Sequence, residues 1–116
     1  MRKRGPNKMK QIKTTPLARC DELIEEATVD CYNESEQITG FFYMLEDQLA
    51  VPFTVKLLGQ EVIVEKIDIT EENEIVAICR YGRNRQRISI LELPLPSPRP
   101  GGTEWIDAYR HWARWR

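Results

Sequence analysis

Apolar positions along the N-terminal third of the chain recur every three or four residues, a spacing that predicts two amphipathic helices. The first is expected over residues 16–32, with Thr15 as its N-cap and Pro16 at its first position. The second is expected to begin after Ser35 as N-cap and to end before Pro52. The apolar faces consist of Leu17, Cys20, Ile24, Ala27 and Cys31 in the first helix, and of Ile38, Phe41, Phe42, Leu45 and Leu49 in the second.

Between Phe53 and Leu93 the pattern changes to short β-rich runs separated by turns around residues 59, 71–73 and 82–84. Strands in such close succession predict a small, curved, antiparallel sheet of four to five strands, of the kind found in half-open SH3-like barrels. The four runs are Phe53–Leu58, Glu61–Asp68, Glu74–Arg80 and Gln86–Leu93.

The proline-rich stretch at residues 94–102 predicts a stiff connector with polyproline character, although it could also serve as an SH3-type ligand. Thr103 then caps a final helix, whose apolar stripe is expected to pack on the sheet. The predicted class is therefore α+β, with N-terminal helices, a curved sheet and a C-terminal helix. The stripe comprises Trp105, Ile106, Tyr109, Trp112 and Ala113.

A chain of 116 residues is long enough for one domain with its own core. Residues 1–14 are basic and almost free of apolar side chains, so we expect a flexible tail there and a single domain over residues 15–116. The three cysteines lack C-x-x-C spacing and lie in apolar patterns that are typical of reduced, buried thiols. No apolar run is long enough for a membrane span. These features predict a cytoplasmic monomer without membrane contact.

The formal net charge of -1 conceals a strong segregation of charge. From Cys20 to Glu74 there are fifteen acidic residues and only two basic ones, Lys56 and Lys66. A compact domain with so many carboxylates repels itself, and a hard cation held by carboxylate oxygens relieves that repulsion. The pattern therefore favours a metal site or a fold that brings the opposite charges together.

Two groups of carboxylates are candidate cation ligands. Glu46 and Asp47 fall in the last turns of the second predicted helix, where the helix dipole favours cations and disfavours carboxylates. Asp68, Glu71, Glu72 and Glu74 crowd a turn, but this turn is not an EF-hand loop: it lacks the central glycine, and Cys79 stands where the bidentate glutamate belongs. Alternatively, the carboxylates of both groups are simply exposed to solvent. For Glu46 and Asp47, pairing with distant arginines is a further alternative.

A basic hairpin turn offers a different kind of site. Four arginines and a tyrosine in this turn, together with the basic tail, could contact the phosphates and bases of nucleic acid or an acidic protein. The same arginines could instead pair across strands with Glu61, Glu65 or Glu74. The residues of this candidate site are Arg80, Tyr81, Arg83, Arg85 and Arg87.

Enzyme signals are weak. The only histidine, His111, lies among aromatic residues without a partnered serine or cysteine motif, and no phosphate loop, dinucleotide fingerprint or zinc spacing occurs. The sequence indicates a protein that is not an enzyme.

The segment from Gly40 to Phe53, GFFYMLEDQLAVPF, resembles the hallmark of a small cyanobacterial and bacterial calcium-binding family, the CcbP family. In that family an aromatic-rich helix ends in Leu-Glu-Asp and is followed by Leu and then Pro-Phe. The resemblance extends over about residues 20–115. It includes Gly59, Val62 and Val64, Tyr81-Gly82, Ile90–Leu93, and Ala108 with Trp112 and Trp115.

The resemblance implies a compact α/β domain that binds Ca²⁺ without EF-hands, through clustered carboxylates, as a buffer or regulator. By motif position Glu46 and Asp47 carry over as ligands. The family's other ligands have no residue-by-residue match here, and Asp68, Glu71, Glu72 and Glu74 are candidates from the local density of oxygen ligands alone. The leading hypothesis is thus a non-EF-hand calcium-binding protein. The alternative is an SH3-like module that contacts nucleic acid or an acidic partner through Arg80–Arg87 and the basic tail.

Overall fold

A computed structural model describes residues 15–115. The basic tail predicted at residues 1–14 therefore lies outside the described residues. The elements follow one another as α1 (Leu17–Ala27), α2 (Glu34–Gln48), β1 (Phe53–Leu57), β2 (Gln60–Ile69), β3 (Ile75–Tyr81), β4 (Asn84–Ser89) and α3 (Thr103–Trp115). Two N-terminal helices, an antiparallel sheet and a C-terminal helix confirm the α+β prediction.

The sheet is an antiparallel meander in which the strands pair in the order β1-β2-β3-β4. The pairing of β2 with β3 shifts between Val64 and Lys66, and an irregularity of this kind bends a strand and increases its twist. Within the described residues β1 and β4 pair with no further strand, so the sheet is open and has two edges. The curved sheet is therefore present without closure into a barrel.

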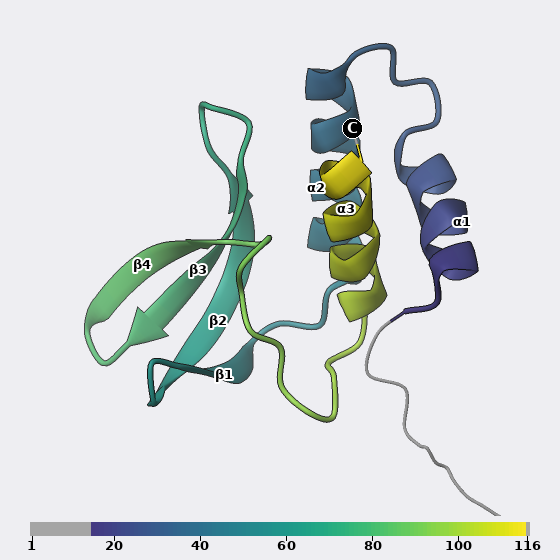
Figure 1. Ribbon diagram of the computed structural model, residues 1–116. Helices are drawn as coiled ribbons and strands as arrows, with labels where there is room; N and C mark the ends of the chain where they lie inside the picture. Colours follow the sequence, from purple (N-terminus) through teal and green to yellow (C-terminus); the bar gives the residue numbers. More distant parts are fainter. Residues whose placement is uncertain (1–14, 116) are drawn as a thin grey trace, which may run out of the picture.

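The three helices gather on one side of the sheet, as Figure 1 shows. Helix α2 packs on β2, and α1 and α3 pack on α2 and on each other. Where α1 and α2 meet, Gly40 lies against the Ala27 carbonyl oxygen, and a Cβ at Gly40 would stand 2.1 Å from that oxygen. Only glycine permits this approach. The aromatic stripe of α3 turns inward, with Trp105 and Tyr109 almost fully buried, but α3 packs mainly on α1 and α2 and not on the sheet as predicted.

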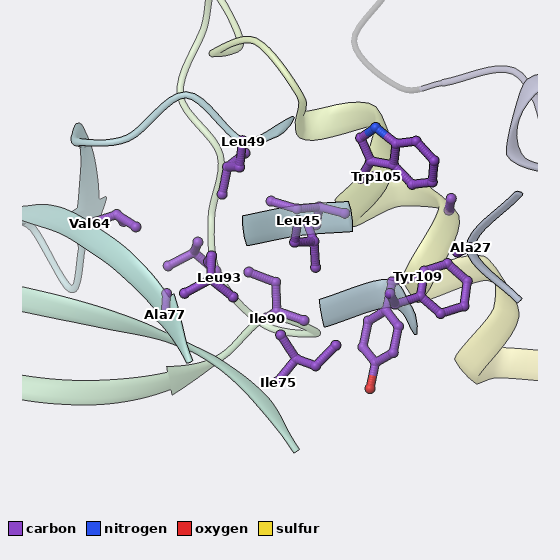
Figure 2. Close-up of a cluster of buried hydrophobic side chains, with 14 of the residues drawn as sticks. Ala27, Leu45, Leu49, Val64, Ile75, Ala77, Ile90, Leu93, Trp105 and Tyr109 are labelled. Carbon is purple, nitrogen blue, oxygen red and sulfur yellow. The ribbon is translucent and has the colours of Figure 1, made fainter. Parts of the chain in front are cut away.

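One continuous core joins the helices to the sheet. Figure 2 shows part of it, where residues of α2, α3 and the segment after β4 meet residues of β2 and β3. At its centre the Phe41 ring, which is fully buried, lies 5.3 Å from the Tyr109 ring and 5.4 Å from the Trp112 ring. Aromatic pairs at such distances add to the stabilisation that burial alone provides.

The first helix differs from its prediction at both ends. Thr15 does not cap it: its amide and its hydroxyl both donate to Asp107 Oδ2 of α3, at 3.0 and 2.8 Å. The helix ends at Ala27 instead of residue 32, because Thr28 closes the last turn onto the Ile24 carbonyl and Asp30 adopts a left-handed conformation with φ of 61°. The capping pattern predicted correctly that a helix starts after Pro16. It was wrong that Thr15 caps this helix, since Thr15 bonds to Asp107 instead.

The second helix is capped by Asn33 and not by Ser35. Asn33 Oδ1 accepts a hydrogen bond from the Glu36 amide at 2.8 Å, and Glu36 Oε1 accepts one in return from the Tyr32 amide at 2.6 Å. This arrangement resembles a capping box with asparagine as the cap, except that Glu36 accepts from the amide of Tyr32, the residue before the cap. Ser35 is the second residue of α2, and its hydroxyl contacts another part of the chain, Asn73.

The last strand is shorter than expected, because β4 ends at Ser89 while Ile90 and Leu93 enter the core as an irregular segment. Arg110 of α3 takes the place of a strand partner. Its Nε donates to the Ile90 carbonyl at 3.0 Å, and its Nη2 donates to the Leu93 carbonyl at 2.5 Å. Burial lowers the pKa of Arg110 below its ordinary value, which is the expected effect of moving a charge away from water.

Within residues 15–115 no helix has both the length and the apolar character that a membrane crossing requires.

Candidate functional site

Glu46 and Asp47 lie in the last turn of α2 with exposed side chains. Asp47 Oδ2 accepts a hydrogen bond from the Gln48 amide group at 2.7 Å, and α2 has no basic residue in its last turn. Neither carboxylate forms an ion pair with any residue between 15 and 115. The pairing with distant arginines that the sequence left open is therefore not seen in the described part of the chain.

The backbone at this end of α2 is held by the loop before α3. The Ala50 amide donates to the Gly101 carbonyl at 2.8 Å, and the Leu49 amide donates to the Leu45 carbonyl at 2.9 Å. Gly102 has φ of +87°, and a Cβ there would stand 2.2 Å from the Gln48 carbonyl oxygen. The loop thus presents the two carboxylates from a fixed helix end.

Next to Glu46 lies a small hollow of about 90 Å³, lined by residues of α2, its C-terminal extension and β2. Lys66 lines the same hollow but does not come within ion-pair distance of Glu46 in the described structure. The other lining residues are Leu45, Leu49, Val51 and Ile67.

The predicted ligands of the β2–β3 turn lie at the opposite end of α2. The Thr70 hydroxyl accepts a hydrogen bond from the Glu74 amide at 3.0 Å, and Asn73 takes a left-handed conformation with φ of 64°. Asn73 Nδ2 then donates to Ser35 Oγ at 3.0 Å. This contact places Glu71, Glu72 and Glu74 next to the first turn of α2, which carries Glu34 and Glu36. Sequence reasoning missed this neighbourhood, because 38 residues separate Asn73 from Ser35.

Asp68 belongs to neither group. Its Oδ1 accepts a hydrogen bond from the Ile69 amide at 2.8 Å, and its side chain lines a hollow on the face of the sheet opposite the helices. The six predicted ligands therefore occupy three places. Among residues 15–115 no three His, Cys, Asp or Glu side chains are arranged so that they could hold one metal ion. The carboxylates fit Ca²⁺ by chemistry and exposure, but the described arrangement contains no preformed cage.

Glu65 of β2 neutralises part of the positive charge of the arginine hairpin. Glu65 Oε2 accepts from Arg80 Nε at 2.7 Å, and Glu65 Oε1 accepts from Arg85 Nε at 2.8 Å. The hydrogen bonds from Arg85 and Arg80 lower the pKa of Glu65. Cross-strand pairing with Glu65 is thus confirmed, whereas Glu61 and Glu74 form no ion pair with these arginines in the described structure. Tyr81, Arg83 and Arg87 are exposed.

The pKa of Tyr109 depends in part on the acidic turn at residues 70–74. Burial raises the pKa of its hydroxyl above the ordinary value of 10.0, and the negative charge of Glu74 raises it further. The folded state holds this proton more tightly than the unfolded state does. The contribution of Tyr109 to the free energy of unfolding is therefore complete below about pH 10 and is lost as the pH rises through the pKa that Tyr109 has in the folded state.

Neutralising Glu74 is expected to lower the pKa of Tyr109 without returning it to 10.0, because the larger cause, burial, persists. The change is Glu74→Gln, and the measurement is a tyrosinate absorbance titration, with the Tyr109→Phe variant subtracted to isolate this phenol from the exposed tyrosines. An unchanged titration would show that Glu74 does not act on Tyr109. Glu71→Gln is the matched control, since Glu71 does not act on this phenol.

Among known protein families, one matches most of the chain. The chain matches the family model for CcbP, described as calcium binding, over residues 21–113. Comparison with curated proteins and with solved structures gave no match. The matched range includes the whole of α2 with Glu46 and Asp47, the sheet, and most of α3. The chain therefore belongs to the CcbP calcium-binding family, and its metal is Ca²⁺.

Proposed function

We propose that this protein is a non-enzymatic calcium buffer or regulator that binds Ca²⁺ through exposed carboxylates, with Glu46 and Asp47 as its first ligands. The observation that supports this is the state of the two side chains: both are exposed at the C-terminal end of α2, and neither forms an ion pair within the described structure. Their negative charges oppose the helix dipole at this end. A bound cation removes that penalty.

The two ends of α2 differ in their suitability for a cation. The C-terminal end carries partial negative charge from its last carbonyl groups, whereas the N-terminal end, next to the 70–74 turn, carries partial positive charge. Glu34 and Glu36 already lie at the N-terminal end, where their charge is favourable. The dipole therefore favours Ca²⁺ at Glu46 and Asp47. Asp68, Glu71, Glu72 and Glu74 are proposed as weaker secondary contacts.

Calcium takes 6–8 oxygen ligands at about 2.3–2.6 Å. Two carboxylates supply up to four oxygens, and main-chain carbonyls or water would supply the others. Because the described structure holds no ready cage, binding must order exposed side chains, which costs conformational entropy. We accordingly expect a modest affinity, such as suits a sensor or buffer working at elevated calcium.

The double change Glu46→Gln and Asp47→Asn is expected to lower Ca²⁺ affinity by at least about tenfold, because ligand charge sets the affinity of calcium sites. The apo protein should be equally stable or more stable, since removing a carboxylate from a helix C-terminal end is worth roughly 0.3–1 kcal/mol. The measurements are calorimetric titration with Ca²⁺ and thermal unfolding in chelator. A marked loss of apo stability would mean that the two residues are structural.

The matched control is the triple change Glu71→Gln, Glu72→Gln and Glu74→Gln, which removes more charge from the other end of α2. It should change Ca²⁺ affinity much less than the double change does. If the triple variant loses calcium binding and the double variant keeps it, the site lies at the turn. For the wild type, Ca²⁺ at a hundred times its dissociation constant should stabilise the fold by about 2.7 kcal/mol, well beyond the effect of equal Mg²⁺.

A further inference from the structure

Strand β4 lies at the edge of the sheet, and a hollow lies beside it on each of the two faces of the sheet. It pairs with β3 along one edge, and no described strand pairs with the other edge. Alternate residues of an edge strand direct their backbone N–H and C=O groups outward, which makes such an edge a template for a further strand. Figure 1 shows the β3–β4 hairpin extending away from the three helices, so none of them covers it.

The hollow on the outer face is polar and basic. Its volume is about 850 Å³, and its walls come from β2, β3 and β4. Lys66, Ile78 and Arg87 lie side by side across the three strands. Lys66 and Arg87 are exposed and form no ion pair with residues 15–115, whereas Arg85 is held by Glu65. The remaining lining residues are Asp68 and Gln86.

The hollow on the inner face is more apolar. It has a volume of about 460 Å³ and is lined by Leu57, Val62, Cys79 and Tyr81, with Asn84, Arg85 and Gln86 at the edge. Tyr81 is half exposed there. Arg85 and Gln86 of β4 line both hollows. A strand beside β4 would therefore direct successive side chains alternately into a basic and an apolar environment.

We propose that β4 binds an extended peptide of a partner protein by strand addition, and that this peptide alternates acidic with apolar residues. Main-chain hydrogen bonds to the free edge would supply affinity, and the two hollows would select the alternate side chains. Charge complementarity determines the choice of partner. Arg87, on β4 itself, attracts carboxylates on one face, and Lys66, two strands further in, adds to the positive potential there. The apolar hollow accepts the intervening side chains on the other face.

A peptide fits this surface better than nucleic acid does. Residues 15–115 contain all 18 acidic residues of the chain but only ten of its basic ones, so the domain as a whole repels a polyanion. A short peptide carries few charges and can place a carboxylate beside Arg87, on the side of the sheet that also carries Lys66. A sugar–phosphate backbone also offers no donors and acceptors that match the edge of a strand.

The test uses the full chain in chelator, so that calcium binding cannot influence the result, and a fluorescent, end-blocked peptide of alternating Glu and Val. Binding is measured by anisotropy, and strand addition by amide hydrogen exchange. We expect binding of this peptide with slowed exchange of the β4 amides. A peptide with the same residues in two blocks, and one of alternating Lys and Val, should bind at least about fivefold more weakly.

Two variants locate the contact. Lys66→Gln with Arg87→Gln is expected to weaken binding by about five- to tenfold, since an exposed charge pair with Arg87 contributes up to about 1 kcal/mol and Lys66 adds a smaller attraction at longer range. Arg83→Gln is the matched control, because Arg83 belongs to the same arginine cluster but lines neither hollow. It should change the dissociation constant by less than about twofold.

Several outcomes would overturn the proposal. Equal binding of the alternating and block peptides would show attraction of charge without strand addition. Unchanged exchange in β4 would place the peptide elsewhere. Tight binding of oligothymidylate, with no binding of the alternating peptide, would make the arginine hairpin a nucleic-acid surface instead.

Discussion

Replacing Phe41 by alanine is expected to lower the free energy of unfolding by about 3–5 kcal/mol, the usual cost of emptying a fully buried aromatic site. The Phe41 side chain has no exposed surface and lies against the rings of Tyr109 and Trp112. Its loss leaves a cavity between α2 and α3 and removes two aromatic contacts together. The measurement is denaturant unfolding followed by circular dichroism.

Tyr43→Ala is the control for this prediction. Tyr43 is an aromatic residue of the same helix but is 61% exposed, so its removal should change stability by no more than about 0.5 kcal/mol. Similar losses in the two variants would mean that Phe41 does not anchor the interface of α2 with α3. A difference of about 3 kcal/mol corresponds to roughly 12 °C or more in Tm for a domain of this size.

The change Asp107→Ala should be nearly as damaging, with an expected loss of about 2–4 kcal/mol. Asp107 Oδ2 accepts three hydrogen bonds, from the amide and hydroxyl of Thr15 and from Arg99 Nη1. Its side chain is 11% exposed and that of Arg99 is 24% exposed. Alanine would leave the guanidinium and the Thr15 donors without their acceptor, and it would release the start of α1 from α3.

Glu104→Ala provides the comparison on the same helix. Glu104 also forms an ion pair, with Arg19 at 3.6 Å, but both partners are more than 40% exposed. Exposed pairs of this kind contribute about 0–1 kcal/mol. Thermal unfolding of both variants decides the matter: a loss in Asp107→Ala as small as that in Glu104→Ala would show that the junction of α1 and α3 does not depend on this carboxylate.

Local signals in the sequence were sufficient for the elements but not for their exact ends. The apolar spacing predicted all three helices and four strands, since each pattern lies within one element. The errors arose where a residue found a distant partner. Thr15, which looks like a cap, bonds to Asp107, 92 residues away. Residues 90–93 resemble a strand, but Arg110 satisfies two of their carbonyl groups from α3.

The candidate site shows the same division. Glu46 and Asp47 could be singled out because the motif and the helix dipole are both local features. That they have no ion-pair partner in the described structure could not be foreseen, because their distance from each arginine depends on the tertiary fold. Pairing of Glu65 with both Arg80 and Arg85 was one of three alternatives, and the register of β2, β3 and β4 selects it.

The amino-acid sequence by itself determined the order of the elements, most of the apolar face of each helix, the segregation of charge and the membership of a calcium-binding family. The face predicted for the first helix was wrong at two positions, because Leu17 is exposed and Leu23, which was left out, is fully buried. Periodicity, caps and turns act over a few residues, so they can be recognised without a fold. Only the tertiary structure decided which charges meet. It separated the six candidate ligands into three places and left the outer edge of β4 without a strand partner among the described residues. Those outcomes depend on packing between segments tens of residues apart, which no local pattern records.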